Sequence, residues 1–249
     1  MKEKQEKEIL NILQNKQFAS VEEIASTLFV SPATVRRKLT VLQEKGLIVR
    51  THGGAQINDA NNFSPTFDLR THTNTLAKRK IALGAIKLIK NGDLVFLDGS
   101  TSSYMVAEYL KEFTDLRVMT NGIDTLSLLA KNNIKGYSTG GYISEVNQST
   151  LVGQLAHQTV STMHANIAFF SAQSVDADGE IYDCFEQENY LRKSMMKNAD
   201  IKVFLCDDKK IDRRSPFYLC NISDIDYVIS NADLKSIFGE KFNDKIIKV

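Results

Sequence analysis

Residues 20–55 read SVEEIASTLFVSPATVRRKLTVLQEKGLIVRTHGGA, and this stretch decides the N-terminal fold. It opens with a capping box, because the Ser20 hydroxyl can accept from the Glu23 amide while the Glu23 carboxylate reaches back to Ser20. Apolar side chains then recur at helical spacing. Ser31 is a second N-cap candidate, and Pro32 follows at the first helical position, where its missing N–H has no partner to lose. The pattern predicts a helix-turn-helix.

The second helix of this pair is predicted over residues 32–45, with Gly46 as its C-terminal cap. At about 100° per residue, Val35, Leu39 and Leu42 fall on one side and must pack inward. The opposite side and its edges carry small and basic residues: Ala33, Thr34, Arg36, Arg37, Lys38 and Thr40. Such a side suits the DNA major groove, because arginine pairs with guanine edges or phosphates and small residues allow close approach. The competing interpretation is the solvated charged face of an ordinary helical subdomain.

A glycine-tipped hairpin is predicted directly after that helix. Residues 47–50, Leu-Ile-Val-Arg, read as a strand, and residues 51–55, Thr-His-Gly-Gly-Ala, read as a turn. Such a hairpin forms a wing that places Arg50 and His52 beside the DNA backbone. The predicted DNA contacts are Ser31, Ala33, Thr34, Arg36, Arg37, Lys38, Thr40, Arg50 and His52.

At these residues the chain resembles the DeoR family of bacterial transcription regulators. Residues 31–39, Ser-Pro-Ala-Thr-Val-Arg-Arg-Lys-Leu, and residues 46–55, Gly-Leu-Ile-Val-Arg-Thr-His-Gly-Gly-Ala, are similar to its DNA-binding signature. The usual recognition-helix pattern is Thr-Ile-Arg-Arg-Asp-Leu, so Val35 is a harmless replacement of isoleucine. Lys38 replaces an aspartate, which adds positive charge and alters either an intramolecular ion pair or a phosphate contact.

Length and composition limit the number of domains and the class of protein. The 249 residues allow one large domain or two modest ones, and 43% hydrophobic with 24% charged residues is typical of a soluble globular protein. No apolar run is long enough for a transmembrane helix, and the charged N-terminus leads into no signal-type core. Neither the three cysteines nor the four histidines have metal-ligand spacing. We therefore predict a cytoplasmic protein with reduced thiols, no metal, no cofactor and no membrane association.

Charge and composition divide the chain. Residues 1–57 hold nine Lys/Arg against six Asp/Glu, whereas the rest holds 22 against 24, which fits a DNA-binding domain on a near-neutral body. Residues 58–75 are rich in Asn, Asp, Ser and Thr without sustained periodicity, and are interpreted as a linker. The predicted domains are therefore a DNA-binding domain at 1–57 and a second domain at 76–249.

The second domain alternates between predicted strands and helices. Residues 94–97, Leu-Val-Phe-Leu, form a continuous apolar run, typical of a strand buried on both faces. Further strands are predicted at 116–120, 135–139, 166–170, 202–206 and 226–230. Helices are predicted to begin at Lys80 and to occupy about 102–111, 123–131, 150–162 and 186–197. This alternation predicts an α/β domain with a mainly parallel sheet covered by helices on both faces.

Polar and glycine-rich residues follow four of these strands. Because open parallel sheets bind ligands beyond the carboxyl ends of their strands, the four loops are expected to meet at one edge. The predicted ligand residues are Asp98, Gly99, Ser100, Thr101, Ser102, Thr120, Asn121, Gly140, Gly141, Asp207 and Lys210. Hydroxyls and amides would bind a phosphate, Asp98 or Asp207 a sugar hydroxyl, and a lysine would supply charge. The competing interpretation, that such residues merely turn the chain, is weaker for four loops together.

The resemblance to the DeoR family extends over nearly the whole chain. Its sensor-domain landmarks look like 98–101, 120–121, 140–141, Ser149 with Gly153 and Ala156, Glu188 and 207–210. The resemblance implies a Rossmann-like fold similar to ribose-phosphate isomerases, and a phosphorylated sugar or related metabolite as effector. Two departures leave the sugar open: the phosphate loop reads Asp-Gly-Ser-Thr-Ser, and either Lys209 or Lys210 matches the family lysine.

Three functions remain in competition. The first is a repressor of a sugar-metabolism operon, at least a homodimer, that binds operator DNA under control of a phosphorylated sugar. The second is a sugar-phosphate isomerase, for which Asp98, Glu188, Asp207 and Lys210 offer candidate bases. The N-terminal domain argues against it, since an isomerase has no use for a groove-reading helix. The third is an architectural DNA-binding protein whose body only oligomerises, which the phosphate-type loop disfavours.

Overall fold

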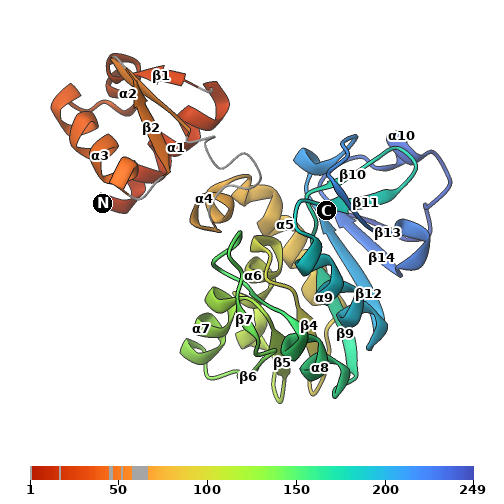
Figure 1. Cartoon of the computed structure of the whole chain (residues 1–249). Coiled ribbons are helices and arrows are strands. Elements are labelled where there is room, and N and C mark those ends of the chain that lie inside the picture. The colour runs from red at the N-terminus through yellow and green to blue at the C-terminus, as the bar shows by residue number, and fades with distance from the viewer. Residues whose placement is uncertain (1, 17, 45–46, 52, 58–66) are drawn as a thin grey trace. The chain divides into compact units, whose positions relative to one another are not determined.

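The computed structural model describes residues 2–16, 18–44, 47–51, 53–57 and 67–249. The chain forms two compact units, Met1–Thr73 and Asn74–Val249 (Figure 1). We refer to them as the head and the body. Separate clusters of buried apolar residues stabilise each of them.

The head has the predicted winged helix-turn-helix fold. Its elements are α1 (Lys2–Lys16), β1 (Phe18–Ser20), α2 (Val21–Leu28), α3 (Pro32–Glu44), β2 (Ile48–Thr51) and β3 (Gly54–Ile57). The strands pair antiparallel in the order β1-β3-β2, and α1 packs against both α2 and α3. The capping box forms, because Glu23 N donates to Ser20 Oγ at 3.1 Å and Ser20 N donates to Glu23 Oε2 at 3.0 Å. Val35, Leu39 and Leu42 are buried, as predicted.

The segment interpreted as a linker contains a helix. Helix α4 (Phe67–His72) lies within 58–75, of which residues 58–66 are outside the described part of the chain. The Thr71 hydroxyl donates to Phe67 O at 2.9 Å, and the Arg70 guanidinium lies 5.9 Å from the centre of the Phe67 ring. The polar composition of 58–75 has no sustained helical periodicity, so the pattern does not indicate this short helix within the segment interpreted as a linker.

Phe29, in the turn between α2 and α3, is expected to reduce the stability of the head. It is 95% exposed and has a φ of 53°, in the left-handed region that disfavours side chains. Phe29→Gly removes about 1–2 kcal/mol of backbone strain against roughly 0.5–1 kcal/mol of added chain entropy in the unfolded state. We therefore expect the melting temperature of the head to rise by a few degrees in thermal unfolding followed by circular dichroism. An unchanged or lower melting temperature would contradict this account of the turn.

A seven-stranded parallel sheet forms the centre of the body, in the order β15-β14-β12-β9-β4-β5-β6. Its strands are β4 (Leu94–Leu97), β5 (Arg117–Thr120), β6 (Lys135–Ser138), β9 (Ala165–Phe170), β12 (Ala199–Cys206), β14 (Tyr227–Ser230) and β15 (Ile246–Lys248). The helices are α5 (Thr75–Ala85), α6 (Thr101–Ala107), α7 (Ile123–Lys131), α8 (Gln154–Ser161), α9 (Glu186–Lys197) and α10 (Lys235–Phe238). The predicted mainly parallel α/β architecture is confirmed.

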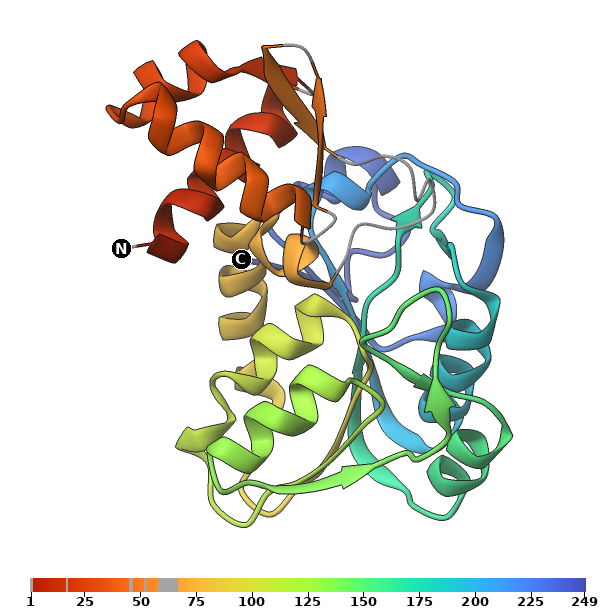
Figure 2. The same ribbon diagram turned by 60° about the vertical axis from the view of Figure 1, so that its left-hand side comes forward.

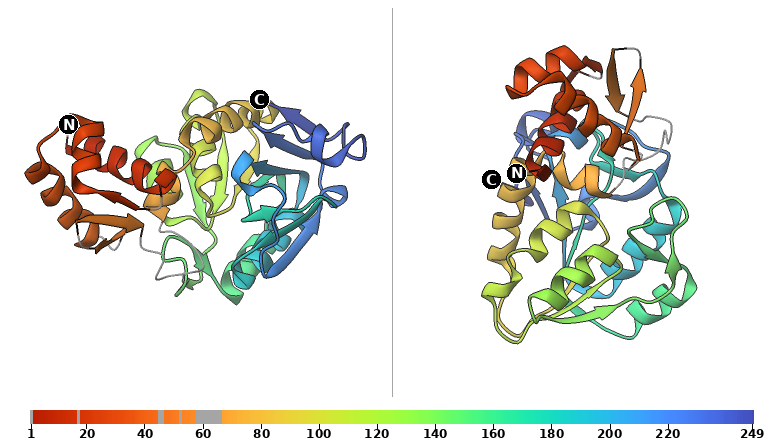
Figure 3. Two further views of the ribbon diagram at one scale, coloured as in Figure 1. Left: turned by 90° about the horizontal axis from the view of Figure 1, so that it is seen from above. Right: turned by 90° about the vertical axis from the view of Figure 1, so that its left-hand side faces the viewer.

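Helices cover both faces of this sheet (Figures 2 and 3). Val95 and Leu97 of β4 pack in one core with residues of α5, α6 and α7. Phe96 points to the opposite face and packs with residues of α8 and α9. This alternation on a strand buried on both sides produces the continuous apolar run seen in the sequence.

The chain reverses direction across the sheet between β4 and β9. From β4 it adds β5 and β6 on one side, and then returns to place β9 and the later strands on the other side. In open α/β sheets, such a topological switch point opens a crevice at the carboxyl ends of the two neighbouring strands. The fold therefore places the strongest candidate for a ligand site beyond β4 and β9.

Smaller elements surround the sheet. A hairpin joins β7 (Tyr142–Ile143) to β8 (Leu151–Val152), and β10 (Ser174–Val175), β11 (Glu180–Asp183) and β13 (Phe217–Asn221) form an antiparallel sheet. The helix predicted near 150–162 begins only at Gln154, because Gly153 has a φ of 100° and ends the preceding strand.

Candidate DNA-reading face and effector site

Helix α3 presents the predicted small and basic side chains to solvent. Ala33, Arg36, Arg37 and Thr40 are exposed, whereas Thr34 is half-buried. The Ser31 hydroxyl accepts from Thr34 N at 3.2 Å and therefore caps the helix. The exposed face of α3 has small side chains, which allow the helix to approach DNA closely, and guanidinium groups, which can donate to base edges in the major groove.

A side-chain hydrogen bond joins the wing strand to this helix. Arg50 on β2 is exposed, and its Nη1 donates to Thr40 Oγ1 at 3.3 Å. Arg36 Nη2 lies 3.7 Å from Glu22 Oε1 in an exposed ion pair, which contributes little in water. Arg37 forms no ion pair with any carboxylate in the described part of the chain. His52, the remaining predicted wing contact, lies outside the described residues.

Lys38 is the exception, and its predicted position on an edge of the free face is wrong. Its side chain is 8% exposed, and its Nζ lies 2.6 Å from Glu6 Oε1 of α1. The residue lies between the inward and outward sides of α3, and the negative charge on α1 draws its amine inward. Of the two roles open to Lys38 in the sequence, the structure has the intramolecular ion pair.

Lys38→Met is therefore expected to lower the stability of the head. The change leaves the Glu6 carboxylate largely buried beside an apolar side chain, which costs about 1–3 kcal/mol. Chemical denaturation followed by circular dichroism measures this loss. The double variant Lys38→Met/Glu6→Gln should recover part of the loss, because the buried charge is then removed; equal stability of Lys38→Met and the wild type would refute the assignment.

The four predicted loops of the body lie at the same edge of the sheet, but they do not all meet. Gly140 and Gly141 follow β6, and Lys210 follows β12, so four strand spacings of about 19 Å in total separate them. Gly141 has a φ of 98°, and an added Cβ would lie 2.2 Å from Val152 O. These glycines turn the chain into the β7–β8 hairpin, and one small ligand cannot contact both them and Lys210.

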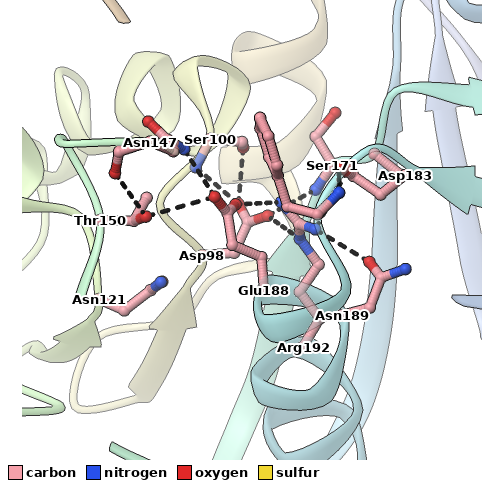
Figure 4. Close-up of polar contacts among 12 residues, drawn as sticks. Asp98, Ser100, Asn121, Asn147, Thr150, Ser171, Asp183, Glu188, Asn189 and Arg192 are labelled. Carbon is pink, nitrogen blue, oxygen red and sulfur yellow. Dashed lines mark hydrogen bonds and ion pairs between the residues drawn. The ribbon is translucent and has the colours of Figure 1, made fainter. Parts of the chain in front are cut away.

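Asp98 lies at the switch point, and both of its carboxylate oxygens accept hydrogen bonds from other residues of the protein (Figure 4). Its Oδ1 accepts from Ser100 N, Ser100 Oγ and Ser103 Oγ at 3.2, 2.6 and 2.6 Å. Its Oδ2 accepts from Ser171 N at 3.2 Å and from Arg192 Nε at 2.8 Å. Asp98 is 1% exposed, so its carboxylate organises the loop and the start of α6.

Arg192 of α9 gathers three buried carboxylates around one guanidinium. Besides Asp98, its Nη1 lies 3.1 Å from Asp183 Oδ2, and its Nη2 lies 2.9 Å from Glu188 Oε2 (Figure 4). Burial alone would lower the pKa of Arg192, but the carboxylates of Asp183, Asp98 and Glu188 outweigh burial and raise it. We refer to these four residues as the Arg192 cluster. Its formal charge is negative, because three carboxylates surround one cation.

Further polar side chains extend the Arg192 cluster. Asn189 Oδ1 accepts from Arg192 Nη1 at 3.1 Å, and Glu188 Oε1 accepts from Asn147 Nδ2 and Thr150 Oγ1 at 2.7 and 3.3 Å. Glu188 is indicated in the sequence by the family resemblance and as a candidate base, whereas the sequence pattern does not indicate Asn147, Thr150, Asn189 or Arg192. The i,i+4 spacing of Glu188 and Arg192 was the available local signal.

The loop after β12 contributes Lys210. Its Nζ donates to Ser171 Oγ at 2.9 Å and to Ala172 O, which places the amine over the end of β9. Lys209 is exposed, so Lys210 is the lysine that lies over this edge. Asp207 is buried, and its Oδ1 accepts from Lys209 N and Asn74 Nδ2, both at 3.1 Å.

The other predicted residues support the loops at β4 and β5. An added Cβ on Gly99 would lie 2.3 Å from Thr150 Cγ2, so only glycine fits there. Thr101 and Ser102 are buried in the first turn of α6. Thr120 Oγ1 accepts from Gly122 N at 3.0 Å. Asn121 is buried beside them.

None of the described helices is long and apolar enough to cross a membrane. Within the same residues, no group of three or more His, Cys, Asp or Glu side chains is arranged to hold a metal ion.

Comparison with protein families and known proteins gave matches over both units. Residues 6–61 match the DeoR-like helix-turn-helix domain, and residues 73–232 match the DeoR C terminal sensor domain. The L-fucose operon activator of Haemophilus influenzae is 33% identical, over 87% of this chain and 86% of that protein. The putative aga operon transcriptional repressor of Escherichia coli O157:H7 is 28% identical (89% and 83%), and the glycerol-3-phosphate regulon repressor of E. coli K12 is 27% identical (90% and 88%).

Among solved structures, ribose 5-phosphate isomerase A of Methanocaldococcus jannaschii matches with a TM-score of 0.43 and 18% identity. The match covers 56% of this chain and 55% of that one.

Proposed function

Since this chain belongs to the DeoR family of transcriptional regulators, we propose that it represses a sugar operon and that a phosphorylated sugar bound by the body controls operator binding. The observation that carries this proposal is the pairing, in one chain, of an exposed arginine face on α3 with polar loops at the switch point of a parallel sheet. The first supplies DNA contacts and the second a ligand site.

The head binds DNA through α3 and the wing. Arg36 and Arg37 contact base edges or phosphates, Ala33 and Thr40 allow close approach, and Arg50 contacts the backbone. Ser31 and Thr34 bind phosphate at the start of α3, and His52 acts from the wing. Lys38 is withdrawn from the contact set because it is buried. The protein is at least a homodimer, so that two heads read two half-sites. It acts in the cytoplasm, where bacterial DNA lies.

The body binds the effector between β5 and β12. Lys210 supplies positive charge, and the loop 99–102 supplies amides and hydroxyls. Asp98 and Asp207 shape these loops rather than contact the ligand, because their carboxylates already accept several hydrogen bonds. The relatives' names refer to fucose, aga and glycerol-3-phosphate genes, which supports a carbohydrate effector. Two of the three are repressors, which favours repression, with the ligand stabilising a state that releases DNA.

The isomerase alternative is not favoured. An isomerase needs a base within hydrogen-bond reach of the substrate carbon. Asp98 and Glu188 are held by Arg192, and Asp207 accepts from Lys209 N and Asn74. The family to which the chain belongs consists of regulators.

A panel of phosphorylated sugars tests the proposal, with the unphosphorylated sugars as controls. A ligand at 100 times its dissociation constant stabilises the folded protein by about 2.7 kcal/mol, which thermal unfolding detects. The stabilising compound is then added to a complex of the protein with DNA selected from a random duplex pool. Selective stabilisation with release of DNA supports the proposal; stabilisation by no phosphorylated sugar contradicts the proposed effector class.

A further inference from the structure

Asn121, the first residue after β5, has a buried side-chain oxygen with no hydrogen-bond partner among the described residues. Its main-chain oxygen accepts from Leu151 N at 2.8 Å, and its Nδ2 donates to Leu151 O at 3.1 Å. The second bond fixes the orientation of the amide, because the reversed side chain would place two oxygens against each other. The remaining atom, Oδ1, has no hydrogen-bond partner in the described part of the chain, although the residue is only 3% exposed.

The surroundings of Asn121 place its side-chain amide beside the candidate effector site. A Cβ added to Gly99 would lie 3.4 Å from Asn121 Nδ2, so Asn121 stands against the glycine of the β4 loop. In Figure 4, Asn121 lies on the Thr150 side of the Arg192 cluster. Thr150 donates to Glu188, which connects this side to the cluster. A ligand bound beyond the end of β4 would therefore lie next to Asn121.

The charges of the Arg192 cluster and of Lys210 determine which end of a ligand binds beside Asn121. Asp98, Asp183 and Glu188 outnumber the single cation of Arg192, so a phosphate is disfavoured beside the cluster. The amine of Lys210 lies over β9, two strand spacings or about 10 Å from β5. That separation is comparable with the length of an extended six-carbon sugar phosphate. The phosphate therefore fits towards Lys210, and a neutral hydrogen-bond donor fits at Asn121.

We infer that Asn121 Oδ1 accepts a hydrogen bond from a hydroxyl group of the effector, and thereby selects polyhydroxylated phosphates. This inference rests on the proposed function and adds the orientation of the ligand and the group that is recognised. A buried acceptor without a donor is unfavourable, and a ligand hydroxyl removes that penalty on binding. Phosphoenolpyruvate, whose ionised form has no hydroxyl to donate, cannot do so.

The test compares wild-type protein with Asn121→Ala by titration calorimetry on the full chain. The probes are ribose 5-phosphate, glucose 6-phosphate and fructose 6-phosphate, together with phosphoenolpyruvate and each monodeoxy analogue of the sugar phosphate that binds. We expect Asn121→Ala to bind that sugar phosphate about tenfold more weakly, which corresponds to 1.4 kcal/mol. One deoxy analogue should show the same loss on the wild type and no further loss on the variant, because both changes remove the same hydrogen bond.

Asn132→Ala is the matched control, since Asn132 ends α7 away from the strand-end loops. The deoxy analogues on the wild type report on the hydroxyl even if Asn121→Ala fails to fold. If the variant binds the sugar phosphate as tightly as the wild type, or if every analogue loses further affinity on the variant, a bound water satisfies Oδ1 and the inference is wrong. If the wild type binds none of the three sugar phosphates, the proposed effector class fails, and the inference with it.

Discussion

Arg37→Ala is expected to weaken operator binding roughly 100-fold while leaving the melting temperature unchanged. Arg37 is exposed on α3 and makes no ion pair with a described carboxylate, so its replacement removes no ion pair from the described part of the head. A bidentate arginine–guanine pair contributes about 1–3 kcal/mol of discrimination, and each 1.4 kcal/mol is a factor of ten. Fluorescence anisotropy with a duplex that the wild type selects from a random pool measures the loss.

Arg117→Ala serves as the control, because it removes an exposed arginine from the first residue of β5 in the body. It should leave DNA binding unchanged. The salt dependence separates two modes of contact: a base-reading Arg37 affects chiefly the selected duplex, whereas a phosphate contact weakens binding to all duplexes and lowers the salt slope by about 1. Full affinity of Arg37→Ala would refute the assignment of α3 as the reading helix.

Arg192→Met should destabilise the body by about 3–5 kcal/mol, since it leaves buried carboxylates without their cation. The side chain of Arg192 is 5% exposed, and those of its three carboxylate partners are 2–8% exposed. For a unit of this size, the expected fall in melting temperature is roughly 10 °C. Differential scanning calorimetry of the full chain measures it.

Two further measurements separate the loss of charge from a simple packing defect. Arg192→Lys keeps the cation but cannot reach all the acceptors, so its stability should lie between those of the wild type and Arg192→Met. The double variant Arg192→Met/Asp183→Asn should recover part of the stability that Arg192→Met loses, because one buried negative charge is then removed. If the double variant recovers no stability, the cluster acts through packing alone.

The sequence predicts most of the fold because the main elements carry strong local signals. The capping box at Ser20 and the apolar run at 94–97 correspond to α2 and β4. The two-residue strands β7, β8 and β10 carry too few residues for any periodicity to appear. The sequence pattern does not indicate helix α1, because its sequence, KEKQEKEILNILQNK, begins with a long charged run that masks its apolar side.

The candidate site is harder to predict, since its residues meet only after folding. The sequence does indicate Asp98 and Lys210, because Asp98 directly follows β4 and Lys210 lies in the short loop after β12. Arg192 lies inside a helix, where a basic residue normally faces solvent, and it is buried here because three carboxylates pair with it. Conversely, Lys38 was assigned to the outside because the pattern within α3 contains no information about Glu6 on α1.

The hydrogen bonds of Asp98 also set an order of events during synthesis. Arg192 lies 94 residues after Asp98, so at roughly 5–20 residues per second a ribosome needs about 5–20 s to supply it. During that interval the Asp98 carboxylate lacks its cation, and β4 cannot pair with β9 until β9 has been synthesised. The head, whose last strand ends at Ile57, is complete far earlier. A nascent chain therefore carries a finished DNA-binding domain before its sensor can close, and premature termination within that window would yield a head without control by the effector.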